Sequence, residues 1–295
     1  NRNSRNFWCN VKGIGSWSLT GHSAEELSKK FTEMQDDSEV TAGFMWQKTT
    51  RESKKYQLRG EILSFIPVDK NVEIMLVTIT NTGRMAQTVT PTAAIPLYGR
   101  SADNIRDHRH VTSLLHRIET TDTGVLVTPT LSFDERGHQV NHMTYYCVGW
   151  SGNGEKPVDF YPTAEDFVGE GGNFERPYAI VKNAEGVKAG TKIEGLEAVG
   201  GLHFSEITLE PEEECSYLIF TGITEDIQEI RNLSKTYTTR EKVLEELEKT
   251  KAYWQEKVNV AYHTGDSDFN QFMHWVSFQP ILRRILSLIH ISEPT

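Results

Sequence analysis

Three features are scarce in this 295-residue sequence, and each scarcity excludes a class of protein. Cysteine occurs three times, as Cys9, Cys147 and Cys215, and this odd number and wide spacing argue against a disulfide framework. Apolar runs stay short of the roughly 18 residues that a membrane span needs. The 31 basic residues are outnumbered by 41 acidic ones, giving a formal net charge of −10 and no cationic surface for nucleic acid. We therefore expect a cytoplasmic protein with neither a membrane nor a nucleic-acid partner.

Sequence motifs for metals and for nucleotide phosphates are missing too. His138 and His142 lie four residues apart, and His108 and His110 two apart, but the HExxH arrangement of zinc proteases does not occur. The Gly-Glu-Gly-Gly run at residues 169–172 lacks the Lys-Ser or Lys-Thr of a P-loop, so a flexible turn is the simpler interpretation. The sequence predicts no metal site and no cofactor.

The overall composition is that of an ordinary globular protein. Hydrophobic residues make up 37% and charged residues 24% of the chain. The length exceeds one usual domain, although all-β sandwiches of roughly 200 to 250 residues fold as single units. We expect one large domain with an appendage.

The first 224 residues predict a body rich in β-strands. Residues 40–66 read as a hairpin with apolar side chains on alternate positions of its second strand. Residues 72–80 form a nearly continuous apolar run, which is expected of a central strand covered on both faces. Residues 88–97 predict an edge or bulged strand, because Pro91 and Pro96 cannot donate hydrogen bonds.

Further strands continue the body towards residue 224. They are predicted at residues 125–133, 143–150, 204–209 and 217–221, and an acidic turn joins the last two as a pair. Residues 151–203 predict mainly loop, with a short helix over residues 163–168. Strands at such intervals, without long helical patterns between them, favour an antiparallel sandwich over βαβ units.

Beyond residue 224 the apolar spacing changes from that of strands to that of a helix. Thr238 and Glu241 form a candidate capping box, and an apolar stripe follows over residues 244–258. We expect residues 225–264 to form a helical linker.

A second, aromatic-rich helix is predicted over residues 265–285. One of its faces carries four large apolar side chains, at Phe269, Phe272, Met273 and Val276. Such a face needs a partner, so we expect this helix to begin a helical domain. Residues 286–295 break the pattern and resemble the translation of a transposon adapter used in sequencing libraries, which predicts a non-native tail. Asn1 is not methionine, and we expect the native N-terminus to be missing as well.

The order of these parts resembles the cellobiose phosphorylase family of inverting glycoside phosphorylases. The motifs that resemble its N-terminal domain lie at residues 6–9 (Asn-Phe-Trp-Cys), 13–18 (Gly-Ile-Gly-Ser-Trp-Ser), 99–111 and 166–169, and residues 275–284 resemble the start of its catalytic barrel. The resemblance covers residues 1–285. It implies a mainly β fold, a large antiparallel β-sandwich of the galactose-mutarotase-like supersandwich type, followed by linker α-helices leading into a truncated α/α barrel.

The resemblance also implies a reaction, the cleavage of a β-linked gluco-oligosaccharide by inorganic phosphate to give an α-sugar 1-phosphate. One carboxylic acid protonates the leaving oxygen, and phosphate, as co-substrate, replaces the water and base of inverting hydrolases. The family places these groups in the barrel, so we assign no catalytic residue in this chain and expect it to be inactive alone. The sandwich would serve in carbohydrate binding and in a homodimer.

One segment of the sandwich is dense in side chains that could bind this substrate. We predict as substrate-binding residues Asp103, Asn104, Arg106, Asp107, His108 and Arg109. Carboxylate and guanidinium groups can hydrogen-bond sugar hydroxyls bidentately, and the amide adds a donor and an acceptor. The alternative is a salt-bridged loop that stiffens the sandwich or an interface. Four tryptophans could stack on sugar rings, but a place in the core or an interface is the simpler interpretation of Trp8, Trp17, Trp46 and Trp150.

Two other functions stay open. A stand-alone carbohydrate-binding sandwich would explain the β-rich body but leaves the two C-terminal helices without a purpose. An accessory domain of a glycoside hydrolase, or of an α-glucoside phosphorylase, that also sets a sandwich before a helical barrel would explain both parts. A paired acid and base at the separation used by inverting hydrolases would favour hydrolysis.

Overall fold

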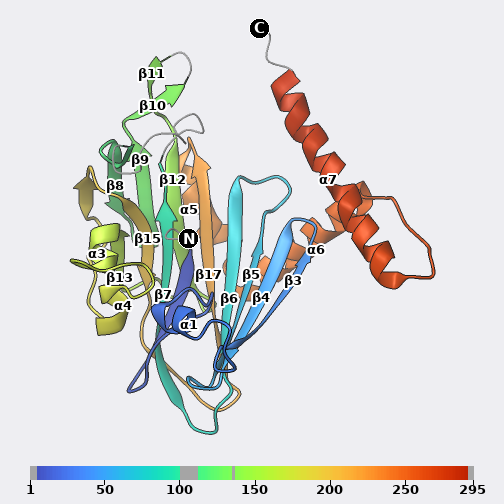
Figure 1. Ribbon diagram of the computed structural model, residues 1–295. Coiled ribbons are helices and arrows are strands. Elements are labelled where there is room, and N and C mark those ends of the chain that lie inside the picture. The colour runs from blue at the N-terminus through green and yellow to red at the C-terminus, as the bar shows by residue number, and fades with distance from the viewer. Residues whose placement is uncertain (1–4, 100–111, 135–136, 292–295) are drawn as a thin grey trace.

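The computed structural model describes residues 5–99, 112–134 and 137–291, and shows two antiparallel sheets packed face to face with helices outside them (Figure 1). The larger sheet has nine strands in the order β14-β8-β9-β12-β17-β6-β5-β4-β3. Its strands are β3 (Asp37–Gly43), β4 (Trp46–Ser53), β5 (Leu58–Phe65), β6 (Val72–Asn81), β8 (His116–Thr120), β9 (Gly124–Pro129), β12 (Thr144–Ser151), β14 (Lys192–Glu194) and β17 (Glu214–Thr224).

The smaller sheet has six strands in the order β13-β15-β7-β1-β2, with β16 also paired to β7. Its strands are β1 (Asn6–Val11), β2 (Gly15–Ser18), β7 (Gln87–Leu97), β13 (Asp159–Thr163), β15 (Ala198–His203) and β16 (Ile207–Leu209). A separate hairpin is formed by β10 (Leu131–Asp134) and β11 (Gly137–Val140).

Strand β6 shows how the apolar pattern builds two cores at once. Successive side chains of a strand point to opposite faces of its sheet. Met75, Val77 and Ile79 face the core between the two sheets, whereas Ile74 and Leu76 face a second core on the outer side of the larger sheet. The prediction of a strand covered on both faces is therefore confirmed.

Helices lie outside the two sheets (Figure 1). They are α1 (Ala24–Ser28), α3 (Ala164–Val168), α4 (Tyr178–Lys182), α5 (Ile227–Thr236), α6 (Arg240–Lys257) and α7 (Ser267–Ile291). Ile230 and Leu233 of α5 and Val243 and Leu247 of α6 close the second core of the larger sheet. Phe167 of α3 packs with α4 in a third core on the smaller sheet.

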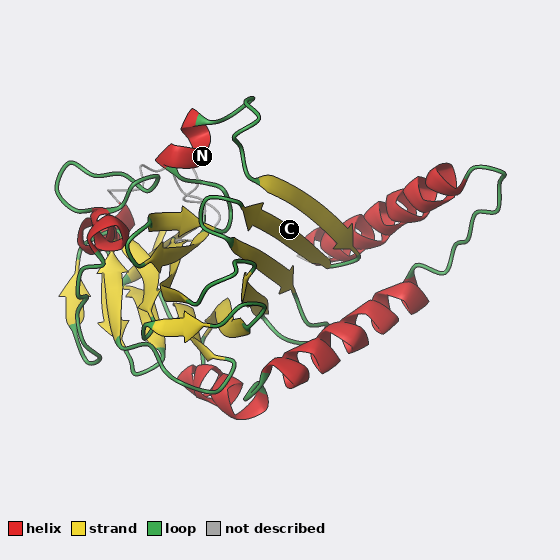
Figure 2. Cartoon of the chain, turned by 90° about the horizontal axis from the view of Figure 1, so that it is seen from below, coloured by secondary structure: helices red, strands yellow, loops and turns green. Residues whose placement is uncertain are grey.

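The predicted architecture, mainly β with an antiparallel sandwich followed by helices, is confirmed. After α6 the chain turns back through a loop into α7, and these two long helices lie beside the β3–β4 end of the larger sheet (Figures 1 and 2). Helix α7 continues to Ile291, beyond residue 285 where we expected it to end. Over the described residues, none of the helices is both long and apolar enough to cross a membrane.

Strand β7 lies inside its sheet, so the prediction of an edge or bulged strand at residues 88–97 was wrong. Pro91 falls in the gap between β15 and β16, where Phe204 N donates to the Pro91 carbonyl and no strand nitrogen is needed from proline. Pro96 lies beyond the last pair between β7 and β1, which joins Ala94 to Asn6. Both prolines therefore sit where the ladder does not require their missing N–H.

Several other local predictions were wrong in detail, among them the single strand at residues 125–133, which is β9 and β10 in two different sheets. Residues 40–66 form parts of three strands, because β3 turns into β4 at residues 44–45. Strands β16 and β17 do not pair, since the acidic turn carries the chain from one sheet to the other. The segment 151–203 contains β13, β14, β15 and α4 as well as the predicted helix. The N-cap of α6 is Thr239 and not Thr238.

Candidate functional site

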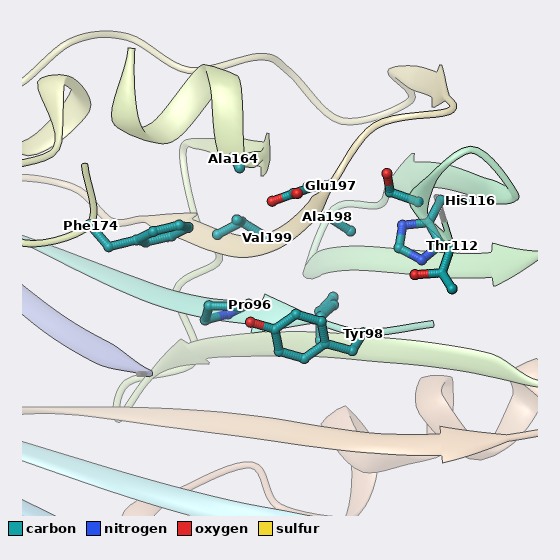
Figure 3. Close-up of a pocket in the computed structure, with 11 residues that line it drawn as sticks. Pro96, Tyr98, Thr112, His116, Ala164, Phe174, Glu197, Ala198 and Val199 are labelled. Carbon is teal, nitrogen blue, oxygen red and sulfur yellow. The ribbon is translucent and has the colours of Figure 1, made fainter. Parts of the chain in front are cut away.

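The six predicted substrate-binding residues, Asp103, Asn104, Arg106, Asp107, His108 and Arg109, lie outside the described residues, so their role stays a prediction. The structure does describe the chain on both sides of them. Tyr98 follows the end of β7 and precedes the segment, and Thr112 and then β8 follow the segment. Tyr98 and Thr112 line one small cavity, so both ends of the segment meet at a single place on the sandwich (Figure 3).

This cavity lies between the end of β7, the start of β8 and the start of β15. Figure 3 shows Thr112 and His116 at one side of it, Phe174 at the other, and Tyr98 and Glu197 between them. Its volume is about 10 Å³, which is room for a single water molecule and not for a sugar ring. The arrangement therefore fixes the chain next to the predicted residues and does not itself hold a substrate.

His116 is the titratable group at the centre of this arrangement. Its ring is buried, and Nδ1 lies 3.0 Å from the carbonyl oxygen of Leu196, so Nδ1 carries a proton and donates it. Burial lowers the pKa of His116, against the carbonyl groups of Leu196 and Gly99, which raise it. A neutral imidazole that donates to a backbone carbonyl ties β8 to the segment before β15.

A second hollow, of about 250 Å³, lies across β7 from the first and also includes Tyr98. Tyr145 and Tyr146 of β12 contribute two more phenol rings, and Arg5 forms an ion pair with Glu73 at its rim. Burial raises the pKa of Tyr145 and of Tyr146, so both hydroxyls stay protonated and can donate hydrogen bonds. Aromatic faces with hydroxyl groups suit a small neutral molecule better than a phosphate ion.

The four tryptophans that were considered for sugar stacking divide into two groups. Trp8, Trp17 and Trp150 are buried, at 2%, 1% and 3% exposure, which confirms the simpler interpretation that they belong to the core. Trp46 is partly exposed and lines a larger cleft of about 820 Å³ beside α7, together with Trp275. From the sequence we predicted only a docking face for the α7 aromatics and no cleft, because the β3–β4 turn that completes the cleft lies more than 200 residues away from them.

The glycine-rich candidate has a structural role. Gly169 and Gly171 adopt positive φ values of 75° and 67°, and Gly172 N donates to the Gly169 carbonyl, so this run is a tight turn after α3. Within residues 5–99, 112–134 and 137–291, no group of three or more His, Cys, Asp or Glu side chains could hold a metal ion.

Comparison with known proteins gives a family. The profile described as Glycosyl hydrolase 94, supersandwich domain, matches residues 15–240, which is more than half of the chain. No significant match was found among curated proteins.

Solved structures give only distant likenesses. A bacterial glucoamylase in complex with acarbose matches with 9% identity and a TM-score of 0.46, covering 85% of this chain and 31% of its own. A polysaccharide lyase matches with 11% identity and a TM-score of 0.36, covering 77% of this chain and 26% of its own. A TPR-domain containing protein from Parabacteroides distasonis matches with 10% identity and a TM-score of 0.28, covering 65% of this chain and 35% of its own. These scores carry no argument about function, and the chain spans about a third or less of each structure's length.

Proposed function

Because the chain belongs to the glycosyl hydrolase 94 family through its supersandwich domain, we propose that it is part of an inverting glycoside phosphorylase. The observation that carries this proposal is the family match over residues 15–240. The motifs at residues 6–9, 13–18, 99–111, 166–169 and 275–284 support a phosphorylase, since they resemble those of the cellobiose phosphorylase family. The substrate class we propose is a β-linked gluco-oligosaccharide, cleaved by inorganic phosphate.

The proposed reaction requires a carboxylic acid and a phosphate site. A carboxylic acid protonates the departing glycosidic oxygen, and phosphate attacks the anomeric carbon from the opposite face, so the configuration inverts to an α-sugar 1-phosphate. We assign neither the acid nor the phosphate site to this chain. We propose that residues 1–224 form the sandwich, residues 225–264 the linker and residues 265–285 the start of the catalytic α/α barrel, with residues 286–295 a non-native tail.

The sandwich would then bind carbohydrate and form a homodimer. We propose that Asp103, Asn104, Arg106, Asp107, His108 and Arg109 contact substrate. Two features support this: both flanks of the segment are held on the sandwich by buried neighbours, and Tyr98 also lines the tyrosine-rich hollow.

The test compares the 295-residue chain with a longer chain expressed from the gene that encodes it. Each is incubated with cellobiose, longer cellodextrins, laminaribiose and β-1,2-linked glucans, with and without phosphate. We expect the longer chain alone to consume phosphate and to release an α-sugar 1-phosphate, identified by NMR from its anomeric coupling. Release of reducing sugar without phosphate would instead identify a hydrolase.

Substrate contact by the charged segment is tested in the same active enzyme by Asp107→Ala. Loss of a charged hydrogen bond costs about 1.5 to 3 kcal/mol, so we expect kcat/KM to fall by roughly 10-fold to 100-fold. Asp37→Ala is the matched control, because Asp37 is an exposed carboxylate on β3. If Asp107→Ala leaves kcat/KM unchanged for both the oligosaccharide and phosphate, the assignment is wrong.

A further inference from the structure

A wide cleft lies between α7, α6 and the β3–β4 turn. Its volume, about 820 Å³, falls within the range of small-molecule sites. Four aromatic side chains line it, and most of its remaining side chains are polar: the aromatics are Phe44, Trp46, Phe272 and Trp275, and the polar groups are Glu248, Lys251, Gln255, Asp268, Gln271 and His274.

Most of the α7 side chains that line this cleft lie away from the apolar face that we predicted to dock, and Phe272 belongs to both. At about 100° per residue, Asp268, Gln271 and Trp275 lie on one side of the helix. Phe269 and Val276 point roughly 120° away from them, and 47% and 37% of their surfaces are exposed. A partner on the side of Phe269 and Val276 would therefore leave the side of the helix that carries Asp268 and Trp275 uncovered.

The cleft is held in shape by aromatic packing at its base. Phe278 of α7 is 3% exposed and packs against Trp254 and Phe44. The Trp275 ring lies nearly parallel to that of Phe44, at an interplanar angle of 15° and a centroid distance of 5.9 Å, yet Trp275 stays 39% exposed. A flat indole, stacked on Phe44, is thus presented to the cleft.

The charges of the lining favour a neutral ligand. Lys251 forms an ion pair with Glu248 at 2.7 Å, and its ammonium nitrogen lies 4.8 Å from the centroid of the Trp46 ring. Asp268 adds one further carboxylate, so the lining is net acidic and disfavours phosphate or a polyanion. Gln255 and Gln271 each offer a donor and an acceptor at the cleft wall.

We propose that this cleft binds a neutral oligosaccharide, with a pyranose ring stacked on Trp275 and its hydroxyl groups hydrogen-bonded by Gln271 and Asp268. Aromatic faces match the apolar face of a sugar ring, and carboxylate and amide groups match its rim of hydroxyls. The choice of a β-linked glucan rests on the proposed function. The geometry of the cleft does not depend on it.

The experiment titrates the 295-residue chain with cellotetraose and with laminaritetraose, and follows tryptophan fluorescence and isothermal heat. We expect saturable binding that Trp275→Ala weakens by about 10-fold or more. Phe269→Ala is the matched control, an exposed aromatic of the same helix on its other face, and should change the affinity less than about 2-fold. Gln271→Ala, a surface change that leaves the aromatic packing intact, should weaken binding by roughly 5-fold.

Several results would overturn the inference. Absence of binding up to ~10 mM sugar would do so, as would equal affinity in Trp275→Ala and the parent chain. Tighter binding of a sugar phosphate than of the neutral sugar would contradict the charge argument. Self-association that Trp275→Ala abolishes, without a response to sugar, would assign the cleft to a protein. None of these results bears on phosphorolysis, which the assay of the longer chain tests separately.

Discussion

At the residue scale, a carboxylate near the N-terminus gathers three partners. Glu25 of α1 accepts hydrogen bonds from Lys29 Nζ at 2.7 Å, Lys55 Nζ at 2.8 Å and the Tyr56 hydroxyl at 2.7 Å. Burial raises the pKa of Glu25, but these hydrogen bonds outweigh it and lower the pKa to about 2. The network ties α1 to the turn between β4 and β5.

This pKa predicts a specific loss of stability in acid. The folded pKa, about 2, lies below the ordinary value of 4.5, so the stabilisation is complete above pH 4.5 and is lost as the pH falls towards 2. We expect Glu25→Gln to lower the free energy of unfolding by about 1 kcal/mol at pH 7. Between pH 4.5 and 2, the free energy of unfolding of this variant should fall less than that of the parent chain, because the variant has no Glu25 carboxylate to protonate. Urea unfolding at several pH values measures both effects.

The control for this prediction is Glu33→Gln. Glu33 is exposed, and no ion pair or hydrogen bond of its side chain is seen among the described residues. Its substitution should leave the free energy of unfolding unchanged within about 0.5 kcal/mol. A pH profile of Glu25→Gln that matches that of the parent chain would show that the network contributes nothing.

The sequence predicts one contact of this network but not the others. Glu25 and Lys29 are four residues apart on a short helix, which is a spacing that predicts an ion pair. Lys55 and Tyr56 are thirty residues away in sequence and arrive only through the β4–β5 turn. The same holds for the cleft, in which Trp46 and Trp275 meet through folding alone.

At the scale of elements, the sequence predicts strands from side-chain alternation but not the order in which they pair. The two-sided burial of β6 follows from its continuous apolar run, and the prediction held. The interior position of β7 could not be predicted, because Pro91 and Pro96 are tolerated only through breaks in the neighbouring strands. Such breaks belong to the partner strands, so the sequence of β7 itself does not show them.

The close approach of the two sheets makes a prediction at Gly200. This glycine of β15 faces Cys147 of β12, and a Cβ atom added to it would lie 2.3 Å from the Cys147 Cβ. We expect Gly200→Ala to lower the free energy of unfolding by about 1 to 3 kcal/mol, because the sheets must move apart. The midpoint of urea unfolding measures this loss.

Gly265→Ala is the matched control for the close approach. Its added methyl group would meet nothing within 4 Å, and Gly265 is not among the glycines with positive φ. The same alanine should therefore change the midpoint little. An equal loss in both variants would trace the effect to glycine itself and contradict the packing argument.

At the scale of the whole molecule, the attachment of α7 differs from that of the sandwich. The two sheets share an extended core, whereas α7 contacts the rest of the chain through a small cluster of Trp254, Val258 and Phe278, with Phe44 and Met45 at its edge. A segment held by few buried apolar contacts opens with a smaller free energy than the global unfolding. The helix should therefore open independently of the sandwich.

Phe278→Ala tests this independence, since Phe278 is the α7 residue at the centre of the small cluster. Truncating a buried phenylalanine costs about 3 to 5 kcal/mol, which would suffice to release α7. We expect faster amide hydrogen exchange throughout α7 and near Phe44, with unchanged protection in β6 and β17. Phe272→Ala, on the same helix but 62% exposed, should leave the exchange of α7 close to that of the parent chain. Loss of protection across β6 and β17 in Phe278→Ala would mean that α7 and the sandwich fold as one cooperative unit.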